Sequence, residues 1–540
     1  MQSQAVGPRQ WWGLVGIALG VSMIVVDTTI VNVITPSVID DLKINSTQAQ
    51  WIQESYAIVF AALLLIFGRL ADLLGARRVF VVGSVLFGAT SLLAGLASSG
   101  EVLILARFLQ GAAGAMLLPT SLSLLNQTFT GKARGQAFAV WGSTIGAATA
   151  VGPVLGGWLS EHATWRWAFG INLPLVAVIV ALTLAFIAPS PRTSGRVDVP
   201  GAVLSALGLA AMAFGLVEGR TYGWVTSTEP FDVFGLSWDG GLSPVFVALA
   251  TAVILLVWFV RRQVNLSRSE GRVEPLMNTR LFSISSFRNG NIATVIIGLG
   301  EFGIIAVLPL WLQFTLDYSA LQAGTALLPL ALGSFFASGM SFVLAEKMSA
   351  LGLVRIGLAL EAVALAALGV VAATTSAPWW SIAIPLFVYG IGVGFATAQV
   401  TNVVLAEVPN SAAGQGSGIQ STFRQVGSAL GIAVLTTVFF STLSQHVRST
   451  LTDAHMSAAQ ANRYAATVTD SAGAAIAPLA ANPATESVAH AAREAMASGV
   501  ALGSYIAAGL LALGVLATLL IPAQRPRATS EAEPAEQLTH

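Results

Sequence analysis

Fourteen apolar runs, each roughly 20 residues long, follow one another along the 540 residues of this chain. A helix needs about 20 apolar residues to cross the hydrocarbon core of a bilayer. Only 10% of the residues are charged, against about 25% in soluble domains. We therefore predict an all-α integral membrane protein with 14 transmembrane helices. The predicted crossings are residues 11–34, 51–74, 79–98, 102–126, 135–160, 166–188, 200–217, 243–260, 288–315, 322–344, 353–373, 380–406, 415–443 and 499–522.

The charges of the connecting segments predict the orientation. If the N-terminus is cytoplasmic, 18 of the 26 Lys and Arg residues fall in cytoplasmic segments and six in outer segments. Positive charge gathers on the cytoplasmic side of membrane proteins, so both termini are expected there, in the plasma membrane. The net charge is zero, which gives no indication of a nucleic-acid partner. The alanine-rich composition favours a bacterial source.

The predicted helices fall into two blocks of six, residues 1–190 and 288–522, with residues 191–287 between them. The middle segment holds two helices and a basic cytoplasmic connector. This 6+2+6 count suggests two pseudo-repeated halves with an inserted hairpin. Residues 444–498 are expected to form a long outer loop, an ordinary external connection. The polar tail, residues 523–540, is expected to be disordered and cytoplasmic.

Several classes of protein are disfavoured by what the chain lacks. It has no cysteine, and its five histidines all fall in predicted loops or the tail, so we expect no metal site and no cofactor. The single Gly-Lys pair, Gly131-Lys132, has Asn126 where an ATP-binding loop needs glycine. A channel would require rings of repeated pore residues, and none is visible. We expect a protein that is not an enzyme.

One motif lies in the predicted cytoplasmic turn between the second and third helices. Its sequence is "GRLADLLGARR", residues 68–78. Gly68 and Gly75 permit close packing and a tight turn. Asp72 can cap the end of the helix that follows. Arg77 and Arg78 are expected to hold the turn at the cytoplasmic face.

Two further stretches lie inside predicted helices. "ARFLQGAAGAMLLP", residues 106–119, carries Arg107 near the start of the fourth helix. "AVGPVLGGW", residues 150–158, belongs to the fifth helix, where small residues let backbones approach and proline lets the helix bend. The residues that provide this second feature are Gly152, Pro153, Gly156 and Gly157.

Taken together and in this order, these motifs resemble those of the major facilitator superfamily. The turn motif is similar to the inner-loop signature, with Leu73 and Ala76 in place of the usual basic residues. The fifth-helix motif is similar to the antiporter motif, with Ala148 where glycine is usual. "VVDTTIVNVITP", residues 25–36, resembles the first-helix motif of the 14-helix drug:proton antiporters of the EmrB/QacA type.

The second half carries the same resemblance in "LPLWLQ", "AGTALLP" and "FRQVGSALG", residues 308–313, 323–329 and 423–431. The resemblance implies two six-helix bundles with an inserted helix pair and export driven by proton entry. It also implies that the small-residue motifs serve the conformational change.

Three ionisable residues are embedded in the first half. At 1.5 Å per residue, Asp27 lies about 10 Å, Glu54 about 5 Å and Arg107 about 9 Å from the outer end of its helix. A charge in the bilayer centre costs about 2.5–3.5 kcal/mol, so such groups face a cavity or one another. We expect Asp27 and Glu54 to exchange protons with Arg107 as their partner. The alternative is a purely structural pair between Arg107 and one acid.

The second half has its own embedded charges. Glu301 lies near the midplane, where it is expected to balance the charge of a cationic substrate or, alternatively, to bond a neighbouring helix. Glu361 and Arg424 lie roughly 13 Å from the inner face and are expected to form an inner gate or a packing pair. Three aromatic residues could stack on planar cations or could face lipid or packing: Trp141, Phe302 and Tyr389.

We therefore predict a proton-coupled multidrug exporter that moves hydrophobic, often cationic compounds by alternating access. Exchange of one proton for one monovalent cation gains nothing from the membrane potential, so both Asp27 and Glu54 are expected to matter for cations. The alternatives are transport of a specific self-made antibiotic, lipid or nutrient, and a non-transporting receptor. The expected partners are the bilayer, small molecules and protons; the sequence leaves the oligomeric state open.

Overall fold

The computed structural model of the chain describes residues 7–44, 46–193, 195–233, 236–238, 240–268, 273–344 and 348–521. Within these residues, 14 helices are long and apolar enough to cross a membrane. They coincide with the 14 predicted crossings, which confirms the predicted all-α membrane fold. The tail expected to be disordered, residues 523–540, lies outside the described residues.

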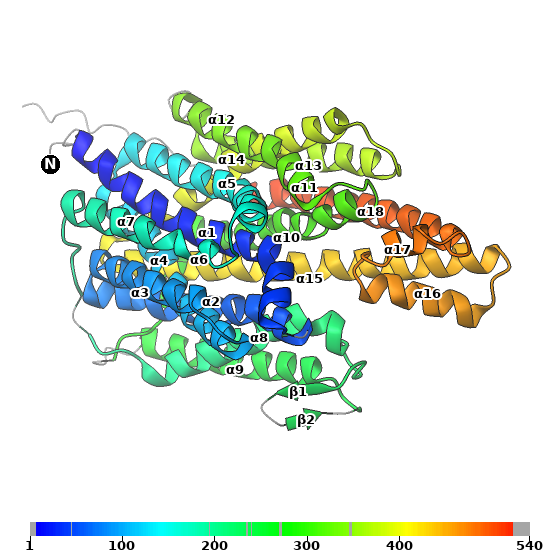
Figure 1. Cartoon of the computed structure of the whole chain (residues 1–540). Coiled ribbons are helices and arrows are strands. Elements are labelled where there is room, and N and C mark those ends of the chain that lie inside the picture. The colour runs from blue at the N-terminus through cyan, green and yellow to red at the C-terminus, as the bar shows by residue number, and fades with distance from the viewer. Residues whose placement is uncertain are drawn as a thin grey trace, which may run out of the picture.

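The first block contains six spans that pack as one bundle (Figure 1). Its first span contacts the fifth and sixth, the second contacts the fourth, and the third contacts the fourth and sixth. The last span is formed by a short helix and a longer one. The helices are α1 (Pro8–Leu42), α2 (Ser46–Leu74), α3 (Ala76–Gly95), α4 (Gly100–Thr128), α5 (Gly131–His162), α6 (Trp167–Gly170) and α7 (Asn172–Phe186).

The second block repeats this order of packing. Its first span contacts the fifth and sixth, the second contacts the fourth, and the third contacts the fourth and sixth. The pseudo-repeat suggested by the helix count is therefore present in three dimensions. The helices are α10 (Ser285–Phe314), α11 (Ala320–Ala326), α12 (Leu328–Leu344), α13 (Ala350–Ala372), α14 (Trp379–Leu405), α15 (Ala413–Asp453) and α18 (Glu486–Thr518), with 3-10 turns η1 (Thr279–Ser283) and η2 (Asn410–Ala412).

Glycines occupy equivalent places in the two blocks. A side chain at Gly152 of α5 would collide with Thr29 of α1. A side chain at Gly427 of α15 would collide with the carbonyl of Val295 on α10. In each half, then, the fifth span lies backbone to backbone against the first. The halves meet along two seams, α2 against α15 and α5 against α12.

The inserted hairpin consists of α8 (Val199–Tyr222) and α9 (Pro244–Arg268), with a two-stranded antiparallel ribbon between them. The strands are β1 (Phe231–Val233) and β2 (Leu236–Trp238). α8 packs against both α2 and α15, so the hairpin touches both blocks. Two side-chain contacts make these links. Trp51 of α2 stacks on Phe214 of α8 with ring centroids 6.4 Å apart, and Arg220 lies 4.0 Å over the ring of Phe440 on α15.

A buried carboxylate fastens the base of this hairpin. Asp198 caps α8 by accepting a hydrogen bond from the Gly201 amide at 3.1 Å. It also accepts three bonds from Arg262 of α9, at 2.7, 2.8 and 3.1 Å, and one from Gln263 at 2.8 Å. Burial raises the pKa of Asp198, but these hydrogen bonds and the Arg262 charge outweigh it, so that the pKa lies below its usual value.

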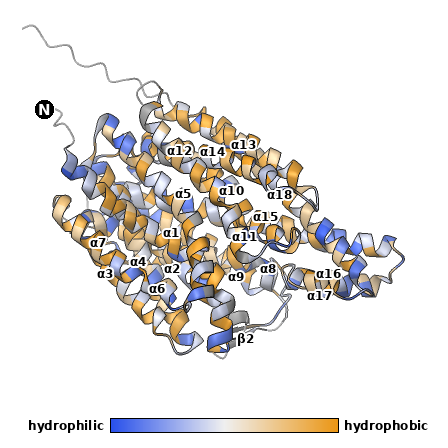
Figure 2. Cartoon of the chain, turned by 45° about the horizontal axis from the view of Figure 1, so that its top comes forward, coloured by the Kyte–Doolittle hydropathy of each residue, from blue (hydrophilic) through white to orange (hydrophobic). Residues whose placement is uncertain are grey.

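The segment expected to be a long outer loop is mostly helical. α15 continues to Asp453, α18 begins at Glu486, and α16 (Ala458–Asp470) and α17 (Ile476–Ala480) lie between them. Alanine has the highest helix propensity, and Ala461, Ala465 and Val468 bury one face of α16. These helices project beyond the bundle (Figure 1) and are more hydrophilic than the spans (Figure 2).

Candidate functional site

The two ends of the bundle differ in charge. One end, here named the arginine-rich end, is where α2 ends and α3, α5 and α15 begin. The helical projection lies at the other end (Figure 1). The residues that define the arginine-rich end are Arg69, Arg77, Arg78, Arg134 and Arg262.

Asp27 and Arg107 form a buried ion pair at the centre of the first block. Each residue is 1% exposed, and Nη1 of Arg107 donates to Oδ2 of Asp27. Arg107 is held in place by a second bond, from its Nε to the carbonyl of Ile52 at 3.1 Å. Its guanidinium also lies 4.4 Å from the ring centroid of Tyr56. The structure thus brings together two of the three charges expected in this block.

A polar shell completes the coordination of Asp27. Its Oδ1 accepts from Nε2 of Gln110 at 2.7 Å and from Nδ2 of Asn172 at 3.2 Å. Both amides also donate to Oγ of Ser91, at 2.9 and 3.1 Å. Sequence reasoning did not assign a role to these three residues. Asn172 could have been found from the sequence, because it is a polar residue at the start of an apolar run. Ser91 could not, because a single serine in a membrane helix indicates no particular role.

The completeness of this cluster limits its chemistry. A buried pair is stable when every polar atom has a partner, and losing one partner leaves an uncompensated charge. Protonation of Asp27 would leave Arg107 as that charge. Proton uptake here therefore requires water, another anion or a rearrangement that reaches Arg107.

Glu54 lies on a different face of α2. Ile52 and Tyr56, four residues apart, form the face that contacts Arg107. Glu54 instead shares the face of Trp51, because residues three apart are neighbours on a helix. Trp51 stacks on Phe214 of α8. Glu54 is 8% exposed, so it is embedded as expected, on the side toward the inserted hairpin.

In the second block, Glu301 of α10 is held by α14. Its Oε1 accepts from Oγ1 of Thr397 at 3.1 Å, and its backbone carbonyl accepts from Oη of Tyr389 at 2.8 Å. Tyr389 is buried between these helices. Trp141 is also buried, and its Nε1 donates to Oγ of Ser121 at 3.1 Å. Both aromatic residues have packing roles in this conformation, and their contact with substrate stays a prediction.

Glu361 of α13 has an unusual environment. It is fully buried, and neither of its carboxyl oxygens has a hydrogen-bond partner among the described residues. Its Cγ packs against Gly392 of α14, where no side chain would fit. Glu361 interacts electrostatically with Glu301, which also interacts with Arg424.

The expected contact between Glu361 and Arg424 is not made in this conformation. In the part of the chain that the structure describes, no ion pair or hydrogen bond joins the two. The guanidinium of Arg424 lies 5.7 Å from the ring centroid of Phe302 instead. A gating role for either residue stays a prediction.

Asp72 links the two blocks at the arginine-rich end. Its carboxylate accepts from the backbone amides of Gly414 at 2.6 Å and Gln415 at 2.8 Å, in the first turn of α15. The expectation that Asp72 caps the following helix, α3, is wrong. α3 begins after Gly75, which has a φ of 92° and provides no side-chain cap. Because α2 packs along α15, the last turn of α2 directs Asp72 toward the other block.

The other residues of the turn motif fall into two groups. Gly68 lies against the backbone of Gly414 and Gly418, with no room for a side chain. Arg77 faces away from this seam and donates to the carbonyl of Leu184 at 2.7 Å, after which α7 soon ends. Arg78 is exposed.

The fifth-helix motif also lies at a junction of the blocks. Gly152 and Gly156 pack on α1, whereas Pro153 and Gly157 face Gly324 and Leu321 of α11. At the other end of α5, Arg134 reaches the second block. It donates to the side chain of Asn402 at 3.2 Å and the carbonyl of Ala406 at 3.3 Å. Sequence reasoning missed this link because nothing local in the sequence indicates its partners.

No group of three or more His, Asp or Glu residues that could hold a metal ion occurs among the residues described. The polar clusters are instead pairs and amide networks inside the two bundles.

Comparison with known proteins identifies the family. The family model "Major Facilitator Superfamily" matches residues 17–250 and 231–432. The chain is 35% identical over 448 residues to the puromycin resistance protein pur8 of Streptomyces alboniger, covering 81% of this chain and 83% of that one. It is 32% identical over 432 residues to the multidrug efflux pump LfrA of Mycolicibacterium smegmatis, covering 80% and 81%.

Solved structures agree on the fold. The human organic anion transporter MFSD10 matches with a TM-score of 0.60 at 14% identity, over 95% of this chain and 100% of that one. The chain therefore belongs to the major facilitator superfamily, and its 14 spans and efflux relatives place it with the 14-helix drug transporters.

Proposed function

We propose that this chain is a proton-coupled exporter of hydrophobic, often cationic compounds. The arginine-rich end and both termini would face the cytoplasm, in agreement with the positive-inside rule. The single observation that carries the proposal is the fully coordinated Asp27–Arg107 pair inside an apolar bundle. Its support is the relatives named for multidrug efflux and antibiotic resistance.

Proton entry would act on this pair. A proton on Asp27 neutralises its carboxylate and so removes the ion pair with Arg107. The guanidinium of Arg107 then requires another anion or water as its partner. The blocks must then rearrange, because an isolated charge is costly in this interior. Gln110 and Asn172 hold the Asp27 carboxylate in one position, so that protonation changes a single well-defined contact.

The second block would carry a second proton. A carboxyl group buried without partners avoids the large cost of ionisation by remaining neutral, and Glu361 meets this condition. Glu301, bonded to Thr397 and near Glu361, would serve as the counter-charge for a cation. Two acids in two blocks would allow more than one proton per cycle, which export of a cation against the membrane potential requires.

The arginine-rich end would open and close as the blocks rock. In this conformation it is closed by Asp72 on α15, by Gly68 against Gly418 and by Arg134 on α14. Opening would break a helix cap worth about 1 kcal/mol and a few hydrogen bonds. Contacts of this modest strength can break and re-form in every transport cycle.

The test is efflux of a lipophilic cationic dye from energised vesicles, with and without a protonophore. Wild type is expected to extrude dye only when energised, and Asp27→Asn at equal expression is expected to lose export. Asp41→Asn is the matched control, because Asp41 pairs with Arg166 on an exposed surface. No dye movement by the wild type, or normal export by Asp27→Asn, would refute the proposal.

A narrower function also has support. Relatives from Streptomyces are named for single antibiotics, among them puromycin and tetracenomycin C. The chain would then export one such compound rather than many. Competition separates the two: several unrelated cations should each inhibit dye export by a multidrug pump, whereas a dedicated exporter would respond to one.

A further inference from the structure

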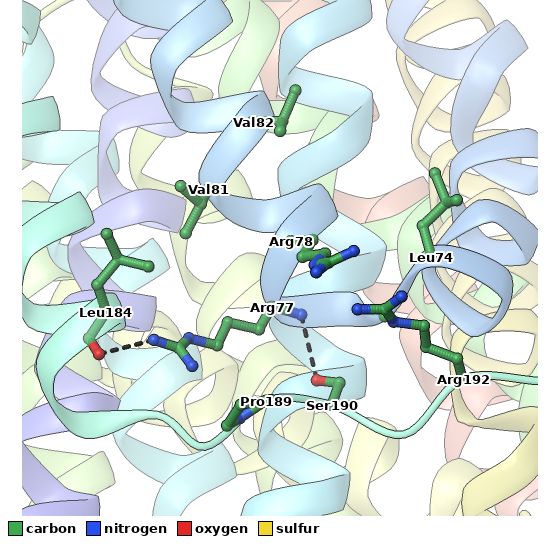
Figure 3. Close-up of a pocket in the computed structure, with 10 residues that line it drawn as sticks. Leu74, Arg77, Arg78, Val81, Val82, Leu184, Pro189, Ser190 and Arg192 are labelled. Carbon is green, nitrogen blue, oxygen red and sulfur yellow. Dashed lines mark hydrogen bonds between the residues drawn. The ribbon is translucent and has the colours of Figure 1, made fainter.

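A pocket of about 390 Å³ lies at the arginine-rich end, outside the seam between the blocks. It is formed by the turn between α2 and α3, the start of α3 and the chain after α7 (Figure 3). A neighbouring pocket of about 830 Å³ shares four lining residues with it, Arg77, Leu184, Pro189 and Ser190, and adds Arg9. Among the described residues, no acidic residue lines either pocket.

The polar side of the pocket is strongly basic. It is lined by Arg77, Arg78 and Arg192, none of which forms an ion pair within the described residues. Figure 3 shows the guanidinium groups of Arg78 and Arg192 directed toward the same space. Arg77 donates a hydrogen bond to the carbonyl of Leu184. This neutral partner fixes the position of the Arg77 guanidinium without balancing its positive charge. Like charges that converge without an acid favour an anionic ligand.

The other side of the pocket is apolar and exposed. Leu74 is 51% exposed, Val82 49% and Leu184 51%. The exposed strip continues along α3 through Val85 and Leu86. The spans of α3 and α7 begin and end beside the pocket, at Ala76 and Phe186. The arginines therefore lie at headgroup depth and the strip lies where acyl chains run.

We propose that this pocket binds an anionic phospholipid, with its phosphate between Arg78 and Arg192 and its acyl chains along the exposed strip of α3. This site is separate from the proposed path of protons and substrate. The apolar strip favours a lipid over a free phosphate, because a soluble anion would use only the basic side.

Occupancy would bear on the closed end of the transporter. The chain that lines the pocket continues to Thr193, whose backbone amide donates to the carbonyl of Asp72 at 2.8 Å. A bound lipid that steadies residues 189–193 would thus steady the residue that caps α15. Anionic lipid is expected to favour the closed arginine-rich end.

The experiment is native mass spectrometry of the purified full chain with added phosphatidylglycerol or phosphatidylcholine. Wild type is expected to retain phosphatidylglycerol preferentially. Each basic residue near an anionic lipid surface contributes to the free energy of lipid binding. Loss of two such contributions in the double variant Arg78→Gln/Arg192→Gln should weaken phosphatidylglycerol binding about 25-fold. Arg261→Gln/Arg268→Gln removes the same charge from exposed positions on α9 and should leave binding unchanged.

Further variants keep the test decisive if the double variant folds poorly. Arg78→Lys/Arg192→Lys should retain most binding, because a lysine also attracts phosphate. Val82→Trp should fill the pocket and displace the lipid although all arginines remain, and Val253→Trp on the exposed face of α9 is its control. Unchanged binding by the glutamine pair, equal loss in the α9 control, or full displacement by glycerol phosphate would each overturn the proposal.

Discussion

The two blocks share one order of helix packing but treat their buried acids in opposite ways. In the first, both oxygens of Asp27 are hydrogen-bonded and Arg107 balances the charge. In the second, Glu361 is equally buried and has no hydrogen-bond partner in the described part of the chain. The difference teaches that burial alone does not define the chemistry of an acid. We expect a paired buried carboxylate to change its charge only when its partner moves, whereas an unpaired one is expected to stay neutral until water reaches it.

The largest expected effect is loss of one member of the first pair. Arg107→Gln leaves Asp27 buried and uncompensated, which should destabilise the protein by about 3–5 kcal/mol. Thermal unfolding of the purified chain measures this. Asp27→Asn/Arg107→Gln should recover part of the loss, and Arg166→Gln, which breaks an exposed pair, should cost no more than about 1 kcal/mol. Equal destabilisation by Arg107→Gln and Arg166→Gln would contradict the burial argument.

The seam between the blocks gives the next effect. Gly68→Ala places a methyl group against the backbone of α15, and overpacking of this kind costs about 1–3 kcal/mol. The closed arginine-rich end should be disfavoured and transport reduced. Gly503→Ala is the control, because no heavy atom lies within 4 Å of an added Cβ there. Protease accessibility of the turn at residue 75 should rise in the first variant and stay constant in the second.

A smaller change in stability is expected at Glu361, and this is the sharpest test of the comparison. Glutamine closely mimics a neutral carboxyl group, so Glu361→Gln should change stability by less than about 1 kcal/mol, while Asp27→Asn should cost more. The number of protons exchanged per substrate, measured in proteoliposomes, should fall in Glu361→Gln. A large loss of stability would show that Glu361 is ionised, and an unchanged proton count would remove it from coupling.

The smallest effect concerns Asp198, a buried acid whose pairing is conventional. Its folded pKa lies below the unfolded value of about 3.9. Its stabilising contribution is therefore fully present above that unfolded value and is lost as pH falls through the lowered folded pKa. After correction for the pH dependence of intrinsic amide exchange, the protection of the amides at the base of α8 should not change between pH 8 and 5. Asp198→Asn should speed exchange across that range, and a strong pH response of the wild type there would contradict the assignment.

Much of the fold was predictable because its signals are local. The length and apolarity of each run determine a crossing, and the count of runs indicated the two blocks and the hairpin. Depth in the bilayer predicted that Arg107 would pair with an embedded acid, but it left Asp27 and Glu54 as alternatives, and only the structure identifies Asp27 as the partner. The helical projection was missed because alanine-rich helices are not apolar enough to resemble spans.

The partners of Asp72 and Arg134 were beyond local reasoning. Asp72 bonds amides 342 and 343 residues away, and Arg134 bonds an amide side chain 268 residues away. These contacts depend on which surfaces the two blocks present to each other. A sequence pattern that repeats every few residues predicts local structure, but it does not indicate which surfaces of the two blocks will pack together.

The inserted hairpin makes the two seams of the molecule unequal. α8 covers the seam of α2 and α15 and is tied to both by Trp51 on Phe214 and Arg220 on Phe440. Within the described residues, the hairpin gives the seam of α5 and α12 no such cover. We therefore expect a compound dissolved in the bilayer to meet one seam covered by the hairpin and one that the hairpin leaves uncovered, and lateral entry from lipid to favour the side of α5 and α12.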